Sequence, residues 1–200
     1  MSAVLRIAVA DDEPDVREYL QKVLVRLGHT VVGTATNGQE LIALAKKTVP
    51  NLIISDIKMP DMDGIEAATT IYKEQPIPVI LVSAYHDADL IARAEADHIM
   101  GYLVKPIKQA DLIPTIALAM RRFEQFQALQ KEAADLRQAL EDRKTIEKAK
   151  GILMKRTKTD EHDAFRNLQK MASAQGRKLV DVAEMILVAD QLLFAPSPSK

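Results

Sequence analysis

The feature that most constrains this 200-residue chain is a fivefold alternation of short apolar segments with amphipathic helical segments. Several of the apolar segments carry no regularly spaced polar residue, which is typical of strands buried on both faces of a parallel sheet. Strands that alternate with helices build a doubly wound α/β sheet. The first 120 residues are therefore expected to form a five-stranded parallel sheet covered by helices on both faces.

The expected boundaries follow from turn residues and from the spacing of apolar residues. One helix, for example, is expected to end at Gly28, and another segment ends before Pro50. Strands are expected at residues 5–10, 30–35, 52–55, 78–83 and 102–104, and helices at residues 16–27, 38–47, 65–74, 88–96 and 109–120.

From about Arg121 the pattern changes to continuous helix formers, with no proline before Pro196. Apolar residues within this part recur at alternating three- and four-residue spacing, which is the pattern of a coiled-coil seam. They are Phe126, Leu129, Ala133, Leu136 and Leu140. Because the pattern lasts only about two heptads, one amphipathic face packed on a domain explains it equally well.

Three short helices are expected after the seam, at residues 143–154, 160–170 and 179–193. Each has one apolar stripe, so together they can bury a small shared core as a three-helix bundle. Ala164, Phe165 and Leu168 are expected in that core. Residues 195–200 have the composition of a disordered tail.

Composition and charge exclude several classes of protein. The chain has no cysteine, which excludes a disulfide scaffold, a thiolate zinc site and a cysteine nucleophile. No signal-peptide core or membrane span is evident, so we expect a cytoplasmic protein. Residues 1–120 carry 11 basic and 16 acidic residues, whereas residues 121–200 carry 16 and 12. The basic half is compatible with a polyanionic partner and equally with an ordinary solvated helical surface.

Polar side chains follow the expected strands where each strand ends. Asp11 and Asp12 follow the first strand, Asp56 the third, Ser83 the fourth and Lys105 the fifth. The carboxyl ends of parallel strands meet at one edge of a sheet, so these groups are expected to converge. Carboxylates gathered in this way repel one another, and Mg²⁺ would relieve the repulsion. The site would then offer a metal, a cation, a hydroxyl donor and a carboxylate able to attack phosphorus.

Residues 3–120 resemble the receiver domain of bacterial two-component response regulators. The resemblance rests on residues 9–13 (VADDE), 55–60 (SDIKMP), 63–64 (DG), 82–84 (VSA) and 102–106 (YLVKP). It implies a flavodoxin-like fold and a phosphoryl group received from a sensor histidine kinase.

The resemblance to receiver domains also assigns roles to individual residues. Asp56 would be the phosphoacceptor, and the backbone carbonyl of Lys58 would bind Mg²⁺ together with Asp11, Asp12 and Asp56. Ser83 and Lys105 would sense the phosphoryl group, and Tyr102 would be the aromatic switch that turns inward afterwards. The Lys105–Pro106 peptide would be cis.

The C-terminal segment resembles the ANTAR domain, a three-helix RNA-binding module of antitermination regulators. The resemblance rests on residues 146–154 (IEKAKGILM), 164–165 (AF) and 178–183 (KLVDVA). It implies binding of paired RNA hairpins, for which Lys148, Lys150, Lys155 and Arg156 are the candidate phosphate contacts. The expected organisation is a receiver at 3–120, a coiled-coil linker at 121–145, an ANTAR bundle at 146–194 and a tail at 195–200.

We therefore expect a response regulator, not an enzyme, in which phosphorylation promotes homodimerisation and binding of RNA hairpins. Two alternatives stay open. The C-terminal helices could be a protein-interaction or dimerisation module without nucleic acid, or a DNA-binding output, although no helix-turn-helix pattern is evident.

Overall fold

The computed structural model describes residues 4–84 and 99–194. The helix predicted at residues 88–96 and the predicted tail at 195–200 lie outside this part of the chain. The chain divides between Ala128 and Leu129 into two compact units, and each is described separately below.

The first unit contains a five-stranded parallel sheet in the order β2-β1-β3-β4-β5, which confirms the predicted fold. Its strands are β1 (Arg6–Ala10), β2 (Thr30–Ala35), β3 (Leu52–Asp56), β4 (Val79–Ser83) and β5 (Ile99–Val104). The fifth strand begins three residues earlier than predicted. Pairing with β4 accounts for this, because the ladder extends back to a contact between Val79 and Ile99.

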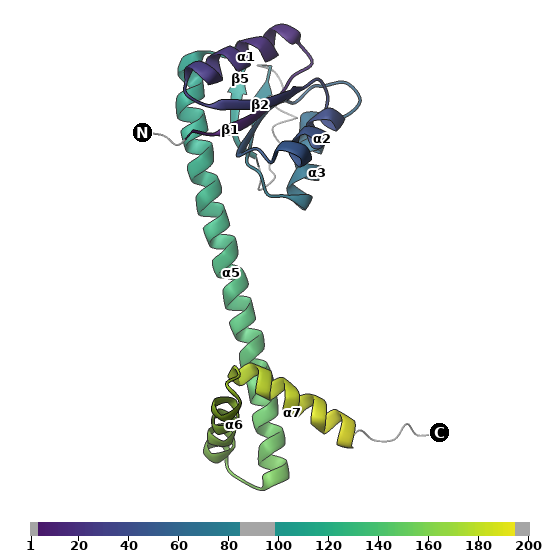
Figure 1. Cartoon of the computed structure of the whole chain (residues 1–200), viewed down its shortest axis with the longest axis vertical. Coiled ribbons are helices and arrows are strands. Elements are labelled where there is room, and N and C mark those ends of the chain that lie inside the picture. The colour runs from purple at the N-terminus through teal and green to yellow at the C-terminus, as the bar shows by residue number, and fades with distance from the viewer. Residues whose placement is uncertain (1–3, 85–98, 195–200) are drawn as a thin grey trace, which may run out of the picture. The chain divides into compact units, whose positions relative to one another are not determined.

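Successive strand residues bury alternate faces of the sheet. In β1, Ile7 and Val9 pack with helices α1 (Pro14–Arg26) and α5 (Gln109–Thr157), whereas Ala8 and Ala10 pack on the opposite side. That opposite side is covered by α2 (Gly38–Thr48) and α3 (Gly64–Glu74), as Figure 1 shows. Both faces are therefore sealed, and the carboxyl edge of the sheet is the edge left for polar chemistry.

Local capping residues explain where several helices begin. The side chains of Asn37, Asp63 and Asp160 accept hydrogen bonds from backbone amides three residues later, which satisfies free N–H groups of α2, α3 and α6 (Glu161–Gln175). Helix α6 ends at Gly176 in the left-handed conformation, which glycine adopts without strain.

Helix α5 is one continuous element of 49 residues. The predicted helices at 109–120 and 143–154 and the linker between them are therefore parts of a single helix. Leu129, Leu136 and Leu140 on the predicted seam are 65%, 61% and 58% exposed. Phe126, the first residue of the predicted seam, packs against the core of the first unit, so the packing alternative describes that end of the stripe. Coiled-coil pairing of the three leucines stays a prediction.

The second unit packs the last part of α5 with α6 and α7 (Leu179–Phe194), as the three-helix prediction requires (Figure 1). Its hydrophobic core cluster consists of the buried residues Ala149, Leu168, Ala172, Val182 and Ala183. The prediction that Phe165 lies in this core is wrong, because Phe165 is 36% exposed. Ala164 and Leu168, also expected in the core, are fully buried.

No helix in the described residues is both long enough and apolar enough to cross a membrane.

Candidate functional site

Three acidic side chains and one lysine meet at the carboxyl edge of the sheet. Asp11 directly follows β1, Asp56 is the last residue of β3, and Lys105 directly follows β5. The ammonium Nζ of Lys105 lies 2.6 Å from Asp56 Oδ2, 2.8 Å from Glu13 Oε1 and 3.1 Å from Asp11 Oδ2. The predicted convergence of strand-end groups is therefore present, with Lys105 at its centre.

Asp11 is fully buried, yet one of its carboxylate oxygens is poorly satisfied. Its Oδ1 accepts a hydrogen bond from the backbone amide of Glu13 at 2.9 Å. Its Oδ2 is near Lys105 but has no hydrogen bond of acceptable geometry among the described residues. Burial raises the pKa of Asp11, and the neighbouring charge of Asp56 adds to the rise, although Glu13 and Lys105 oppose it.

Lys105 carries the compensating charge. Burial acts to lower the pKa of its ammonium, but hydrogen bonds to Asp56 and Glu13 and the close contact with Asp11 outweigh burial and raise the pKa above its ordinary value. The same contact with Lys105 lowers the pKa of Glu13. Lys105 is therefore a permanent cation at neutral pH, placed directly against an oxygen of Asp56.

The site has the donor set of a hard divalent cation. Asp11, Asp12, Glu13 and Asp56 each offer a carboxylate oxygen, and these oxygens lie within 4.8 Å of one another. One lysine does not neutralise four carboxylates, and Asp11 Oδ2 is paired with Lys105 at 3.1 Å without a hydrogen bond of good geometry among the described residues. The residues present therefore fit Mg²⁺, which prefers oxygen ligands and needs only one or two carboxylates from the protein.

The other predicted site residues lie beside Asp56 or on the neighbouring strands β4 and β5. The backbone amide of Lys58 donates to Asp56 Oδ1 at 3.3 Å, so its peptide lies directly beside the carboxylate. Ser83 is buried at the end of β4, with its hydroxyl donating to the Ala84 carbonyl at 2.9 Å. The Lys105 amide donates to the Ser83 carbonyl at 2.9 Å, and the Lys105–Pro106 peptide is cis. Tyr102 is 37% exposed on β5.

Three residues that sequence reasoning left without a role also shape the site. Arg17 donates to the backbone carbonyls of Asp11 and Asp12 at 2.6 and 2.9 Å and so holds the acidic turn. Glu13 shares the Lys105 ammonium. Gly64 leaves space for Asp56, because a Cβ there would collide with the Asp56 carbonyl and lie 2.8 Å from Ser55 Oγ. Spacing along α1 could have indicated Arg17, but the contact at Gly64 depends on tertiary structure.

The four basic residues predicted to contact RNA differ in their surroundings. Lys150 is only 8% exposed, and its Nζ lies 2.7 Å from both Glu147 Oε2 and Glu161 Oε1. Arg156 donates twice to Asp190 Oδ1, at 3.0 and 2.9 Å.

Lys148 and Lys155 are exposed, and within the described part of the chain neither has an ion pair or hydrogen bond. Lys150 and Arg156 therefore link α5 to α6 and α7, respectively, whereas the side chains of Lys148 and Lys155 are exposed to solvent.

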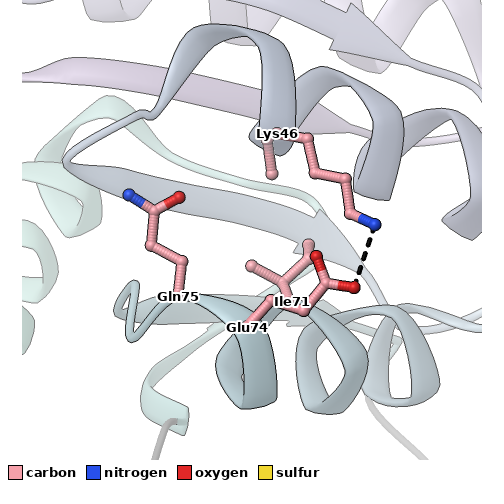
Figure 2. A pocket seen from close by; sticks show the side chains of 5 residues that line it. Lys46, Ile71, Glu74 and Gln75 are labelled. Carbon is pink, nitrogen blue, oxygen red and sulfur yellow. Dashed lines mark ion pairs between the residues drawn. The ribbon is translucent and has the colours of Figure 1, made fainter.

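Two hollows on the first unit differ in their relation to the predicted site. One hollow lies between α2 and α3, where Lys46 and Glu74 form an ion pair at 2.9 Å (Figure 2). It holds no residue of the acidic cluster. A second hollow of about 600 Å³ borders Lys105 and Glu13 and continues along α1 to Tyr19, so the acidic edge has open space beside it.

Comparison with protein families matches two segments of the chain. Residues 7–117 match the response regulator receiver domain, and residues 134–187 match the ANTAR domain. The second match begins within the long helix α5, in the segment predicted as a linker.

Individual relatives agree with the family matches. The chain is 41% identical over 182 residues to the transcriptional regulatory protein PdtaR of Mycobacterium tuberculosis, covering 91% of this chain and 89% of that protein. It is 35% identical to the transcriptional regulatory protein YxjL of Bacillus subtilis, over 58% of this chain and 55% of that one.

Two solved structures resemble the first unit. The response regulator domain of Thermotoga maritima CheB has a TM-score of 0.55 at 30% identity, covering 60% of this chain and 98% of that one. The signal receiver domain of NarL from Mycobacterium tuberculosis has a TM-score of 0.56 at 28% identity, with the same coverage.

Proposed function

Since the chain belongs to the response regulators that join a receiver domain to a C-terminal ANTAR domain, we propose that phosphorylation of Asp56 by a histidine kinase switches on RNA-hairpin binding by its helical unit. The observation that carries the proposal is the contact of Lys105 with Asp56 at 2.6 Å inside a cluster of carboxylates. That arrangement is suited to a phosphoryl group, which brings several anionic oxygens.

The first proposed step is transfer of a phosphoryl group to Asp56. A carboxylate oxygen of Asp56 would form the new bond to phosphorus while the bond from phosphorus to the donor histidine nitrogen breaks. Lys105 would contact an oxygen of the transferred group, and the hollow beside Glu13 and Lys105 would give the donor room to approach.

Asp11, Asp12, Asp56 and the Lys58 carbonyl are the proposed ligands of Mg²⁺. When bound, the ion would offset the negative charge of the phosphoryl oxygens. Asp11 Oδ2 supports the assignment because this buried oxygen otherwise lacks a hydrogen bond.

The second proposed step is the response of Ser83, Lys105 and Tyr102. A phosphoryl group on Asp56 competes for the Lys105 ammonium, which in the unmodified chain is shared by three carboxylates. Ser83 would turn its hydroxyl from the Ala84 carbonyl to the new oxygens, and Tyr102 would move inward from its half-exposed position. The population of the active form would shift because that form alone offers these contacts.

The proposed output begins with pairing of α5 from two chains. The apolar stripe at Leu129, Leu136 and Leu140 is exposed in the single chain, and a parallel coiled coil would bury it. Dimerisation would bring two helical units together, which suits a ligand that contains two hairpins.

For RNA contact we retain Lys148 and Lys155 and assign Lys150 and Arg156 a structural role. The first two are exposed and unpaired among the described residues, whereas the others hold α5 to α6 and α7. Charge reversal at Lys150 would therefore be a poor test of RNA binding, because it would also damage the fold.

The test is binding of a fluorescein-labelled RNA with two adjacent hairpins, and of a DNA duplex of equal length, to the full chain. Mg²⁺ and beryllofluoride would be added to mimic the phosphorylated aspartate. We expect activation to tighten RNA binding by at least about tenfold, with little effect on DNA. Asp56→Ala should abolish both phosphoryl uptake and the response to beryllofluoride.

If activation produced dimers but no preference for RNA, the protein-interaction alternative would replace RNA binding while the receiver assignment stood. If Asp56→Ala still accepted a phosphoryl group, the phosphoacceptor assignment would be wrong.

A further inference from the structure

The acidic turn between β1 and α1 is not closed by an ordinary helix cap. Helix α1 begins at Pro14, and Glu13 at its N-cap position forms no side-chain cap hydrogen bond. Glu13 instead extends its carboxylate to the ammonium of Lys105 at 2.8 Å. The turn carries Asp11 and Asp12, two of the proposed Mg²⁺ ligands, so the placement of these ligands depends on other contacts.

Arg17 of α1 supplies such a contact. Its Nη1 donates a hydrogen bond to the backbone carbonyl of Asp11 at 2.6 Å and another to that of Asp12 at 2.9 Å. Hydrogen bonds from an ionised donor are stronger than those between neutral groups. Two consecutive peptide carbonyls that share one nitrogen cannot rotate independently, so Arg17 fixes the backbone from which both aspartate side chains branch.

Arg17 also lies near the turn that precedes α2. The Glu40 carboxylate accepts hydrogen bonds at 2.8 Å from both the amide and the hydroxyl of Thr36. These hydrogen bonds lower the pKa of Glu40, and the charge of Arg17 lowers it further. The Asp11 amide donates to the Ala35 carbonyl of the same turn at 3.2 Å. The acidic turn is therefore supported by a neighbouring turn with its own hydrogen bonds.

We propose that Arg17 is a positioning residue for Mg²⁺, which holds the carbonyls of Asp11 and Asp12 so that their carboxylates face the site before the ion binds. The inference rests on the proposed Mg²⁺ site and adds to it a residue that contacts neither the ion nor the phosphoryl group. Residues that orient metal ligands in this way commonly account for about ten- to a hundredfold in metal affinity.

The charge of Arg17 and its hydrogen bonds predict opposite effects on Mg²⁺ affinity. A cation near the site repels Mg²⁺, so removal of that charge alone would raise the affinity. Loss of positioning would lower the affinity. A purely structural role would lower the melting temperature and leave the Mg²⁺ affinity of the folded chain unchanged. The sign of the change in affinity therefore separates these three roles.

The test uses Arg17→Met in the full chain, because methionine keeps an apolar stem and removes both the charge and the donors. Calorimetric titration should show a Mg²⁺ affinity lower than that of the wild type by about tenfold. Phosphoryl uptake from acetyl phosphate should be slower at low Mg²⁺ concentration, and saturating Mg²⁺ should restore the rate. Circular dichroism establishes whether the variant is folded at the temperature of the titration.

Two further variants complete the comparison. Arg17→Lys keeps a cation with N–H donors on a shorter side chain, so its Mg²⁺ affinity should lie between those of the wild type and Arg17→Met. Arg26→Met removes the same charge from an exposed position in the last turn of α1 and should leave Mg²⁺ affinity unchanged.

The outcomes distinguish this inference from the proposed function. If the wild type bound no Mg²⁺, or if Asp12→Asn bound it as tightly, the proposed metal site would be wrong and the inference with it. If the wild type bound Mg²⁺ and Arg17→Met bound it equally well or better, the inference alone would be overturned. An equal fall in Arg26→Met would also overturn it. Should Arg17→Met not fold, equal affinities of Arg17→Lys and the wild type would overturn it.

Discussion

Burial disfavours the charged form of Asp11. Its side chain is fully buried, its pKa is raised by that burial, and one oxygen lacks a hydrogen bond. We predict that Asp11→Asn stabilises the metal-free protein by about 1 kcal/mol, because a neutral amide is easier to bury than a carboxylate. The same variant should lose the additional stability that Mg²⁺ gives the wild type. Urea unfolding with and without Mg²⁺ measures both effects, and a less stable metal-free variant would contradict the prediction.

The raised pKa of Asp11 also predicts how Mg²⁺ binding depends on pH. Protons and the metal compete for the same carboxylate, so affinity should fall as the pH approaches this pKa from above. Because the pKa lies above the ordinary value of 3.8, the fall should begin at a higher pH than an ordinary aspartate would produce. Lys105, whose pKa is raised, stays charged throughout and adds no pH dependence of its own. Calorimetric titration with Mg²⁺ between neutral pH and about pH 5 tests this, and constant affinity would contradict it.

Gly64 has no room for a side chain, whereas a Cβ added to Gly151 of α5 would meet no atom within 4 Å. An added Cβ would meet the Asp56 carbonyl and Ser55 Oγ, both part of the rigid strand β3. We predict that Gly64→Ala lowers the free energy of unfolding by about 2 kcal/mol or more and slows phosphoryl uptake by displacing Asp56. Denaturant unfolding and uptake from a small phosphodonor are the measurements. Gly151→Ala is the matched control, since the same added methyl group meets open space there.

At the scale of elements, spacing predicted the described strands and helices of the first unit well, because both faces of the sheet had to be apolar. The ends of strands were harder to predict. Strand β5 begins at Ile99 because this residue pairs with Val79 of β4, and pairing between strands is not visible in the sequence of one segment. The sequence has no proline between Pro114 and Pro196, which is compatible with a continuous helix. The same absence is compatible with several helices joined by loops, so it did not predict the full length of α5.

Side-chain placement within the helical unit was the weakest part of the prediction. Phe165 lies beside Ala164 in sequence, and helical spacing allows either to face the core. In the structure Ala164 is fully buried, whereas Phe165 is 36% exposed. Lys150 was similarly ambiguous, because its partner Glu161 lies on another helix. Pairings between helices cannot be read from the spacing within one helix.

Lys150 joins α5 to α6 through Glu161 and also pairs with Glu147 of its own helix, and hydrogen bonds to both residues raise its pKa. Lys150→Glu would place three carboxylates together and should lower the melting temperature of the helical unit by several degrees. Lys150→Met keeps the packing of the stem without the like-charge repulsion and should melt much closer to the wild type. Circular dichroism measures both variants. Equal melting of the two would show that repulsion among the three carboxylates does not destabilise the unit.

At the scale of the whole molecule, the prediction concerns self-association. Leu136 is 61% exposed in the single chain and lies on the apolar stripe of α5. We expect Leu136→Asp to weaken the activated dimer by at least about tenfold while leaving the fold of the monomer intact. Ala134→Asp adds the same charge to an exposed position off the stripe and is the control. Analytical ultracentrifugation compares them, and equal dimer fractions would exclude the stripe as the interface.

Because α5 is one uninterrupted helix, the length of any insertion in it determines how the residues on its two sides are rotated relative to each other. The helix carries receiver core residues near its start, the apolar stripe in its middle and the core residues Ile146, Ala149 and Leu153 near its end, with no loop between them. Two residues inserted after Leu140 would turn everything beyond them by about 200° about the helix axis. Seven would turn it by only about 20°. A chimera that uses either end of this chain should therefore change the length of α5 in multiples of seven residues, which nearly preserves the angular position of every residue after the junction.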